Sequence, residues 1–459
     1  MNQENRKLHS LYISTVEIPK HTQYNFLPST ILVKLKAMKI LLVGYNVPHS
    51  GFTRVMHSII ANLDPNHEIH YISLGLVQGQ RTYQWGENVH LHTYDPQEQF
   101  DPLRNESIKE FLIKDQPDIV FMLNDIWFFK YYAEILKQHL GKAKLVYYTP
   151  IDGRLVDCTA LVDFEIVDEL VAYTAFGAQE LQRGIDTLIA TGKMNHRPNL
   201  STIAHGVDTA RFRPLGGEPG TTAWKAGKLS AKQQLWGKEV ATDDAFIVLN
   251  ANRMQSRKCI DVTIEGFAKF AKDKPANVKL CLHHAILPPD AEKQLNAWVK
   301  QWGIEDRLLF RKVDQQEEHI DDEALNLIYN ACDVGVNTSQ GEGWGLIAFE
   351  HAATGAAQIV PQHSACTELW ENAGLLLAPK TQHQPARHPM SFTKVSADEL
   401  ALHLEYLYRN KKALNEWSKR AYQHAHSPHF QWNSIGSAWD QLFQHTITQG
   451  RNVTSLLNQ

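Results

Sequence analysis

Residues 339–350 read Ser-Gln-Gly-Glu-Gly-Trp-Gly-Leu-Ile-Ala-Phe-Glu, and this stretch predicts the fold of the chain. Before it, residues 333–337 (Asp-Val-Gly-Val-Asn) are typical of the end of a buried strand. After it, the apolar run 348–353 predicts a helix that stops at Gly355. We therefore expect a strand, a glycine-rich turn and a helix start. The backbone N–H groups and the dipole of such a helix start favour a bound anion.

The turn contains three glycines, Gly341, Gly343 and Gly345, around the carboxylate of Glu342, and a second carboxylate, Glu350, follows eight positions later in the predicted helix. Glycines permit a ligand to approach the main chain closely. We expect Glu342, in the loop, to reach a hydroxyl group. Glu350, about two turns into the helix, can accept two hydrogen bonds from a diol. An anion with a sugar on each side is a nucleotide sugar, which is the predicted ligand; the alternative is a helix-capping loop with two solvated glutamates.

The composition limits the class of protein. A length of 459 residues predicts two or three domains. The net charge of −4 argues against a nucleic-acid-binding protein that relies on a broad basic surface. The five cysteines are scattered along the chain, which favours small buried side chains in a reducing cytosol. The histidines show no metal-binding spacing, so no metal ligand is predicted. No apolar run is long enough to span a membrane, and we expect a cytoplasmic protein.

Short apolar runs alternate with helical segments along most of the chain, which predicts doubly wound α/β sheets. Residues 214–228, rich in Gly and Pro, interrupt this pattern and are interpreted as a loop near the domain junction. Residues 379–392, rich in Gln, His and Pro, are interpreted as a further loop. Two α/β halves place the natural ligand site in the cleft between them, at the carboxyl ends of the strands.

The expected division is an N-terminal extension at 1–37, α/β domains at 38–213 and 229–425 on either side of the 214–228 loop, and a C-terminal helix and tail at 426–459. The C-terminal segment is expected to cross back to the first domain. Residues 1–37 lack the compact apolar segment of a signal peptide. Because Met38 directly precedes the first predicted strand, the extension is either native or the product of a misassigned start codon.

Two cations, Arg253 and Lys258, lie five positions apart in a predicted strand-to-helix loop of the second half. Arginine offers a planar fork and lysine a point charge, so the pair can hold a diphosphate. The alternative interpretation is an exposed basic loop. Arg257 is a third cation in this loop, and the sequence assigns it no role.

The Glu342…Glu350 spacing, with Gly-Trp-Gly-Leu between the two, resembles the Glu-x7-Glu motif of retaining family 4 glycosyltransferases (glycosyl transferases group 1). The Arg253…Lys258 pair and the segment His205-Gly206-Val207-Asp208 also resemble segments of this family. The resemblance covers most of the chain from Met38 and is weak in the first half. It implies an α/β, GT-B fold, in which two Rossmann-like domains face a central cleft.

The resemblance also implies roles for residues. Glu342 would hold hydroxyls of the donor sugar, Glu350 the ribose diol, and Arg253 and Lys258 the diphosphate. Further donor-binding residues would be Gly341, Gly343, Trp344, Gly345, Leu346, Glu368 and, in the first domain, Gly51. For Glu368, a role in helix capping is an equally good alternative.

The chain departs from the family pattern in several places, including the loop around Gly51, which has one glycine fewer than usual. Cys259 follows Lys258 where a glycine is usual, and Ala365-Cys366 replaces a common Gly-Gly. The loop after residue 147 lacks a histidine that often touches the transferred sugar, and Asp152 is the nearest polar candidate there. The alternative for Asp152 is a plain turn residue before Gly153. Residues 124–125 (Asn-Asp) end the preceding strand and are expected to line the same cleft.

The expected reaction is retaining transfer of a hexosyl group from a nucleoside diphosphate sugar to a hydroxyl acceptor, in glycan, polysaccharide or glycolipid synthesis. No obligatory metal or other cofactor is expected, because enzymes of this kind use Arg, Lys and a helix N-terminus, and the chain lacks a suitable Asp-x-Asp loop. We expect no nucleic-acid partner, and peripheral contact with the inner membrane face only if the acceptor is a lipid. The alternatives are a catalytically silent nucleotide-sugar-binding protein and a nucleotide-sugar epimerase. The base, the sugar, the acceptor and the oligomeric state stay open.

Overall fold

The structure of the chain is a computed structural model that describes residues 36–47, 50–77, 85–94, 101–242, 244–283, 289–309 and 320–449. The expectations for residues 1–35 and for the tail 450–459 lie outside the described residues.

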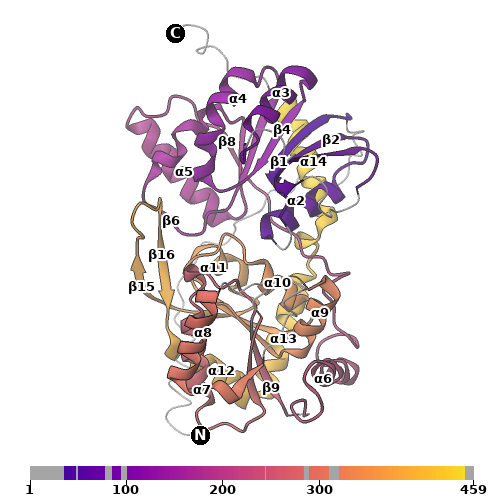
Figure 1. The fold of residues 1–459 in the computed structure, drawn as a ribbon, viewed down its shortest axis with the longest axis vertical. Coiled ribbons are helices and arrows are strands. Elements are labelled where there is room, and N and C mark those ends of the chain that lie inside the picture. Colours follow the sequence, from indigo (N-terminus) through magenta and orange to yellow (C-terminus); the bar gives the residue numbers. More distant parts are fainter. Residues whose placement is uncertain are drawn as a thin grey trace. The chain divides into compact units, whose positions relative to one another are not determined.

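The first domain is built on a seven-stranded parallel sheet with the strand order β3-β2-β1-β4-β5-β7-β8 (Figure 1). Its strands are β1 (Lys39–Tyr45), β2 (Glu68–Val77), β3 (Val89–Tyr94), β4 (Ile119–Leu123), β5 (Lys144–Thr149), β7 (Glu169–Ala172) and β8 (Asn199–Thr202). β4 and β5 are buried along their whole length, because helices cover both faces of such a sheet. The helices of this domain are α2 (Gly51–Asn62), α3 (Asn105–Asp115), α4 (Ala133–His139) and α5 (Ala175–Ala190).

The second domain repeats this plan with a six-stranded parallel sheet in the order β11-β10-β9-β12-β13-β14. Its strands are β9 (Phe246–Asn250), β10 (Val278–Leu282), β11 (Leu308–Leu309), β12 (Val334–Val336), β13 (Ala357–Pro361) and β14 (Leu375–Leu377). Its helices are α7 (Ile260–Ala271), α8 (Pro289–Trp302), α9 (Asp322–Ala331), α10 (Leu346–Ala353), α11 (Ser364–Trp370), α12 (Ala397–Arg409) and α13 (Lys411–Ala425). The two Rossmann-like sheets confirm the predicted fold class.

The last described helix, α14 (Trp432–Thr448), packs against the first domain, where Figure 1 shows it in yellow among the indigo elements. The ring of Trp439 lies 4.9 Å from that of Phe121, a residue of β4, in an edge-to-face contact. Asp440 accepts a hydrogen bond of 3.0 Å from the backbone N–H of Asp64 and lies 3.2 Å from His67 Nε2. The core of the first domain is therefore completed by the distant end of the chain.

The interpretation of residues 214–228 as a loop is wrong beyond Thr221. Helix α6 (Thr222–Trp236) begins there, and the Thr221 hydroxyl caps it by accepting a hydrogen bond from Trp224 N. The buried Lys228 and Lys232 of α6 reach the half-buried Asp333, with Nζ–O distances of 3.7 and 2.8 Å. The glycines and prolines cluster before the cap, and the ion pairs to a residue far along the chain hold the helix against the second domain.

The interpretation of residues 379–392 as a loop is also wrong. β15 (Pro379–His383) and β16 (Met390–Val395) form an antiparallel hairpin, and β16 pairs with β6 (Arg154–Leu155) of the first domain. Figure 1 shows this hairpin beside β6. All residues of β15 are exposed, so its Gln and His side chains carry no apolar pattern, and the strand is specified by its pairing with β16.

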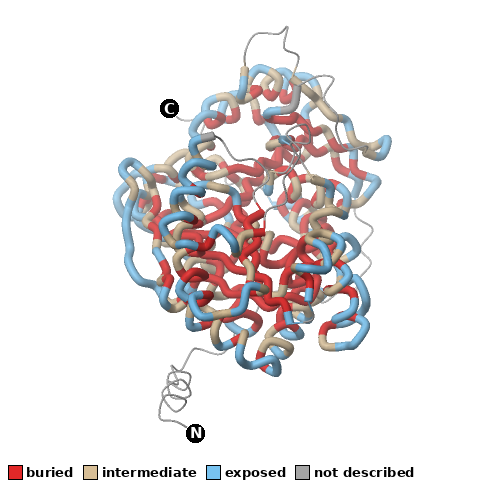
Figure 2. The backbone as a smooth tube through the Cα atoms, turned by 60° about the horizontal axis from the view of Figure 1, so that its bottom comes forward, coloured by how far each residue is buried: buried red, intermediate tan, exposed pale blue. Residues whose placement is uncertain are grey.

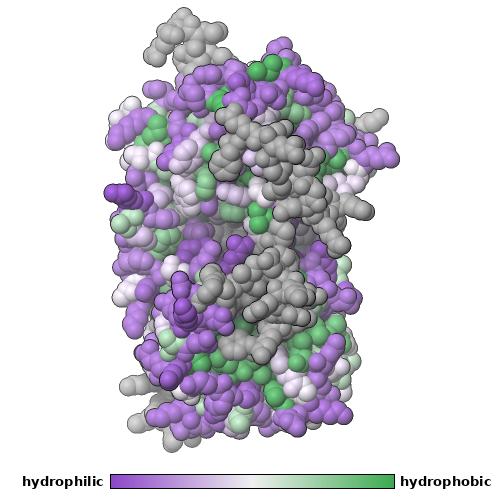
Figure 3. Space-filling model, viewed as in Figure 1, coloured by the Kyte–Doolittle hydropathy of each residue, from purple (hydrophilic) through white to green (hydrophobic). Residues whose placement is uncertain are grey.

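Buried residues follow the strands of both sheets in the interior, and exposed residues lie on the outer helices and loops (Figure 2). On the face drawn in Figure 3, most of the described surface is hydrophilic. Within the described part of the chain, no helix has both the length and the apolar character needed to cross a membrane.

Candidate functional site

A cavity of about 550 Å³ lies where the carboxyl ends of strands from both sheets meet. Residues that follow β4 and β5 line it from the first domain, and residues that follow β9, β10 and β12 line it from the second. The cavity wall includes ten of the twelve site residues predicted from the sequence: Gly51, Asp152, Arg253, Lys258, Glu342, Gly343, Trp344, Gly345, Leu346 and Glu350. Gly341 and Glu368 are not among the residues that line it.

The three glycines of the 341–345 turn have different structural roles. A Cβ on Gly343 would lie 2.6 Å from the Pro150 side chain, and one on Gly341 would overlap the main chain of Asp152. The close approach at these two positions is therefore made by the first domain and not by a ligand. Gly345 differs, because it precedes α10 with a left-handed φ of +91°, and its nearest neighbour in a Cβ position is 4.0 Å away. The space that the sequence predicted for a ligand remains at Gly345, at the start of α10.

Glu342 is buried in this turn and held by cations and an amide. Its Oε1 accepts hydrogen bonds from Lys258 Nζ at 2.5 Å and from Asn337 Nδ2 at 3.1 Å. Its Oε2 lies 3.6 Å from Arg257 Nη1, which is too long for a hydrogen bond. Burial raises the pKa of Glu342, but the charges of Lys258 and Arg257 outweigh it and hold the pKa at about 2. Glu342 is therefore ionised, with Oε2 able to accept a hydrogen bond from a hydroxyl group.

Arg257, to which the sequence assigned no role, connects the two domains. Its Nη1 donates to the backbone carbonyl of Gly341 and lies 3.2 Å from Asp152 Oδ2. Asp152 follows β5 of the first domain, so this ion pair crosses the cavity beside Glu342. Asp125, which follows β4, also lines the cavity and interacts with the charges of Asp152 and Arg257. Burial, and then the charge of Asp152, raise the pKa of Asp125 to about 7. Two acidic groups of the first domain thus face the cations of the second.

Arg253 precedes the short helical turn Ser256–Lys258 that follows β9, and Lys258 is the last residue of that turn. Arg253 is exposed on the cavity wall, whereas Lys258 is half-buried against Glu342, and burial lowers its pKa. Cys259 occupies the position of the usual family glycine and adopts a left-handed φ of +46°. The turn therefore keeps the glycine-like conformation despite the side chain, and α7 starts directly after it.

Glu350 is buried, and it is the fifth residue of α10, about one turn into the helix and not two as the sequence suggested. Its Oε2 accepts a hydrogen bond of 2.9 Å from Tyr329 Oη, and its Oε1 lies 3.5 Å from Arg54 Nη1. Arg54 belongs to α2 of the first domain and also pairs with Asp322 at 2.7 Å. Burial raises the pKa of Glu350.

Glu368 does not join the other site residues. Its carboxylate accepts hydrogen bonds from the backbone N–H groups of Ala175 and Phe176, at 2.9 and 2.6 Å. These are the first residues of α5, so Glu368 of the second domain caps a helix of the first. Gly51, in contrast, lines the cavity, and a Cβ there would lie 3.5 Å from Leu346.

Three further residues of the site were not predicted from the sequence. Arg54, Tyr329 and Asn337 contact the two motif glutamates but come from separate elements. Asn337 ends the strand before the motif, and its position there is the one local signal that could have indicated it. Arg54 and Tyr329 have ordinary helical surroundings in sequence, so only the packing of α2 and α9 around α10 brings them to Glu350.

Comparison with known proteins agrees with this geometry. Residues 232–424 match the family model described as glycosyl transferases group 1. The mannosylfructose-phosphate synthase of Agrobacterium fabrum is 25% identical over 270 residues, which are 57% of this chain and 50% of that protein. The chain spans half or less of the length of the curated relatives that it matches. A glycosyltransferase domain over the second half of the chain is thus confirmed.

Solved structures resemble the whole described fold. The sucrose-phosphate synthase from Thermosynechococcus elongatus superposes with a TM-score of 0.66 at 16% identity, over 89% of this chain and 99% of that one. The catalytic domain of starch synthase IV from Arabidopsis thaliana, bound to ADP and acarbose, gives a TM-score of 0.64 at 13% identity, over 90% and 100% of the two chains. At these identities the likeness is one of fold, and it confirms the GT-B arrangement of two Rossmann-like domains.

Proposed function

We propose that this protein is a retaining glycosyltransferase of family 4, which transfers a hexosyl group from a nucleoside diphosphate sugar to a hydroxyl group of an acceptor. One observation carries the proposal. A single cavity, walled on one side by the glycosyl transferases group 1 domain, collects two buried glutamates, Glu342 and Glu350, two cations, Arg253 and Lys258, and the start of a helix at Gly345. These groups match the hydroxyls, the diphosphate and the ribose of one ligand.

The charge of the departing diphosphate grows in the transition state, so preorganised positive groups aimed at it supply a large part of catalysis. Arg253 on the cavity wall, Lys258 beside Glu342 and the N–H groups at the start of α10 provide them. Glu342 is kept ionised by Lys258, and its Oε2 would accept a hydroxyl of the donor sugar. Glu350 would receive the ribose diol, and Arg54, which now contacts it, would shift toward Asp322 alone.

A transfer assay tests this function. The full chain is incubated with a panel of nucleoside diphosphate hexoses, with and without sugar, sugar-phosphate and glycolipid acceptors. Nucleoside diphosphate release that depends on the acceptor, with the anomeric configuration of the donor kept in the product, supports the proposal. A changed sugar without an acceptor would indicate an epimerase, and binding without turnover in the whole panel would indicate a silent binding protein; either result would overturn it. Acceptance of a glycolipid would support the expected peripheral contact with a membrane.

Glu350→Gln should weaken nucleoside diphosphate binding by roughly 10- to 100-fold, because a hydrogen bond to a charged group contributes about 1.5–3 kcal/mol. The thermal shift of the folded variant measures this, since wild-type protein at one hundred times its Kd gains about 2.7 kcal/mol. Asp322→Asn is the matched control. It removes the other carboxylate that pairs with Arg54, but Asp322 does not line the cavity. Equal losses in both variants would show that Glu350 only anchors Arg54.

We also propose that transfer needs no bound metal, because cations and a helix start already face the diphosphate position. Transfer should survive excess chelator at the wild-type rate. Arg253→Ala is the companion variant: it should weaken nucleoside diphosphate binding strongly and free nucleoside binding little, since the exposed Arg253 side chain faces the cavity. Loss of transfer in chelator, followed by recovery with magnesium or manganese, would contradict the proposal.

A further inference from the structure

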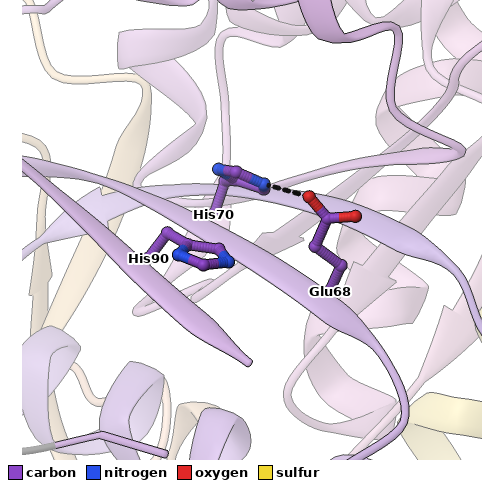
Figure 4. A group of neighbouring side chains, drawn as sticks. All are labelled: Glu68, His70 and His90. Carbon is purple, nitrogen blue, oxygen red and sulfur yellow. Dashed lines mark hydrogen bonds and ion pairs between the residues drawn. The ribbon is translucent and has the colours of Figure 1, made fainter. Parts of the chain in front are cut away.

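Three side chains of metal-ligand type lie close together at the edge of the first sheet (Figure 4), and none of them lines the cavity. Glu68, His70 and His90 present ligand atoms that all lie within 4.8 Å of one another. Glu68 and His70 are two residues apart on β2, so they share one face of the sheet. His90 is the register partner of His70 on the neighbouring parallel strand β3. Strand pairing alone thus brings these three side chains together, although Glu68 and His90 are 22 positions apart in the sequence.

The central imidazole is held on both sides. His70 Nε2 lies 2.9 Å from Glu68 Oε1, and His70 Nδ1 lies 3.1 Å from His92 Nε2. The ring of Phe111, from α3, packs 4.7 Å from the ring of His70 and 5.8 Å from that of His92. A fixed ring whose second nitrogen is hydrogen-bonded is the usual condition of a metal-binding histidine, because that bond sets the tautomer and the orientation.

We propose that Glu68, His70 and His90 bind a divalent transition-metal ion of the zinc type. Imidazole nitrogen and carboxylate oxygen suit Zn²⁺, which they hold at about 2.0–2.2 Å. In this site His70 Nε2 and a Glu68 oxygen, already turned toward each other, would bind the ion, and His90 would complete three protein ligands. His70 Nδ1–H would donate to His92, which thereby orients the ligand. Lys39 Nζ lies 3.3 Å from the same Glu68 oxygen, and the ion would displace that contact.

The position of the cluster indicates its consequence. Glu68 and His70 lie at the start of β2, whereas the cavity lies at the carboxyl ends of the strands. The ion would therefore not touch the reacting sugar, and it would cross-link the edge strand β3 to β2. Because this site and the proposed glycosyl transfer use different residues at different ends of the sheet, either can fail without the other.

The test uses the full-length, metal-stripped protein titrated with Zn²⁺ by calorimetry and with Co²⁺ by visible absorption. Wild-type protein should bind one more equivalent of each ion than His90→Ala or Glu68→Gln, and Zn²⁺ should raise the melting temperature of wild type more than that of either variant. His445→Ala, which removes an exposed histidine on α14, is the matched control and should behave as wild type.

Both substituted side chains are exposed, so the metal-free variants should melt at the wild-type temperature, which checks folding. Stoichiometry and affinity of His90→Ala and Glu68→Gln equal to those of wild type would overturn the proposal. So would an equal loss in His445→Ala, because binding would then be distributed over surface histidines. The transfer rate of both variants should equal that of wild type in every case.

Discussion

Lys258→Met should lower the transfer rate by roughly 100- to 1,000-fold, the typical effect of removing one preorganised group that stabilises developing charge. The variant should also lose stability, by about 3–5 kcal/mol, because removing one partner of a buried ion pair leaves the other charge uncompensated. The charge left behind is Glu342, whose Oε1 is 2.5 Å from Lys258 Nζ. The measurements are kcat on the folded fraction and the free energy of unfolding in denaturant.

The double variant Lys258→Met/Glu342→Gln separates these two effects. With both charges removed, most of the lost stability should return, whereas transfer should stay as low as in the single variant or lower. The pH dependence gives a second check. The pKa of Glu342 is held at about 2, below its ordinary value of 4.5, so its stabilisation is present above pH 4.5 and lost as the pH falls toward 2. This acid-dependent loss of stability should be smaller in Lys258→Met. A wild-type kcat in Lys258→Met would contradict the role of Lys258 in transfer.

Asp152→Asn should lower kcat by about 100-fold while nucleoside diphosphate affinity stays at the wild-type level. Asp152 holds Arg257 across the cavity, and Arg257 in turn contacts the Gly341 carbonyl and faces Glu342. A misplacement of about 1 Å at a reacting centre can cost this much in rate. The diphosphate, in contrast, is expected on the second domain. Turnover and nucleotide affinity of the same purified variant are the measurements.

A readout that a simple turn residue would not move is the pH profile of kcat. The charge of Asp152 helps to raise the pKa of Asp125 to about 7, so Asp152→Asn should lower the pKa of Asp125 and move the corresponding limb of the profile toward acid. If Asp152 were only a turn residue before Gly153, the variant would instead melt at a lower temperature with a normal rate and an unmoved profile.

Local patterns in the sequence were sufficient for the fold class. Continuous apolar runs such as 119–123 and 246–249 form buried strands because parallel sheets are covered on both faces. The motif residues Glu342, Gly345 and Glu350 line the cavity because a strand-turn-helix unit fixes their positions relative to one another within a few residues. These features are encoded within single elements, and so they can be predicted without knowing what packs against them.

Contacts between distant segments were decided only by the tertiary structure. β15 has no apolar alternation, and it forms a strand because its backbone pairs with β16, which in turn pairs with β6 more than two hundred residues earlier. Glu368 caps α5 and Arg54 meets Glu350 because the two domains face each other, and Glu68, His70 and His90 gather because parallel strands align them. The sequence by itself thus determined the two sheets and the strand-turn-helix unit that carries the glutamate motif, because that unit is continuous in the chain. The partners of each charged group depend on which surfaces meet. An ion pair or a helix cap requires only that two groups be close in space, so it produces no recognisable residue spacing in the sequence.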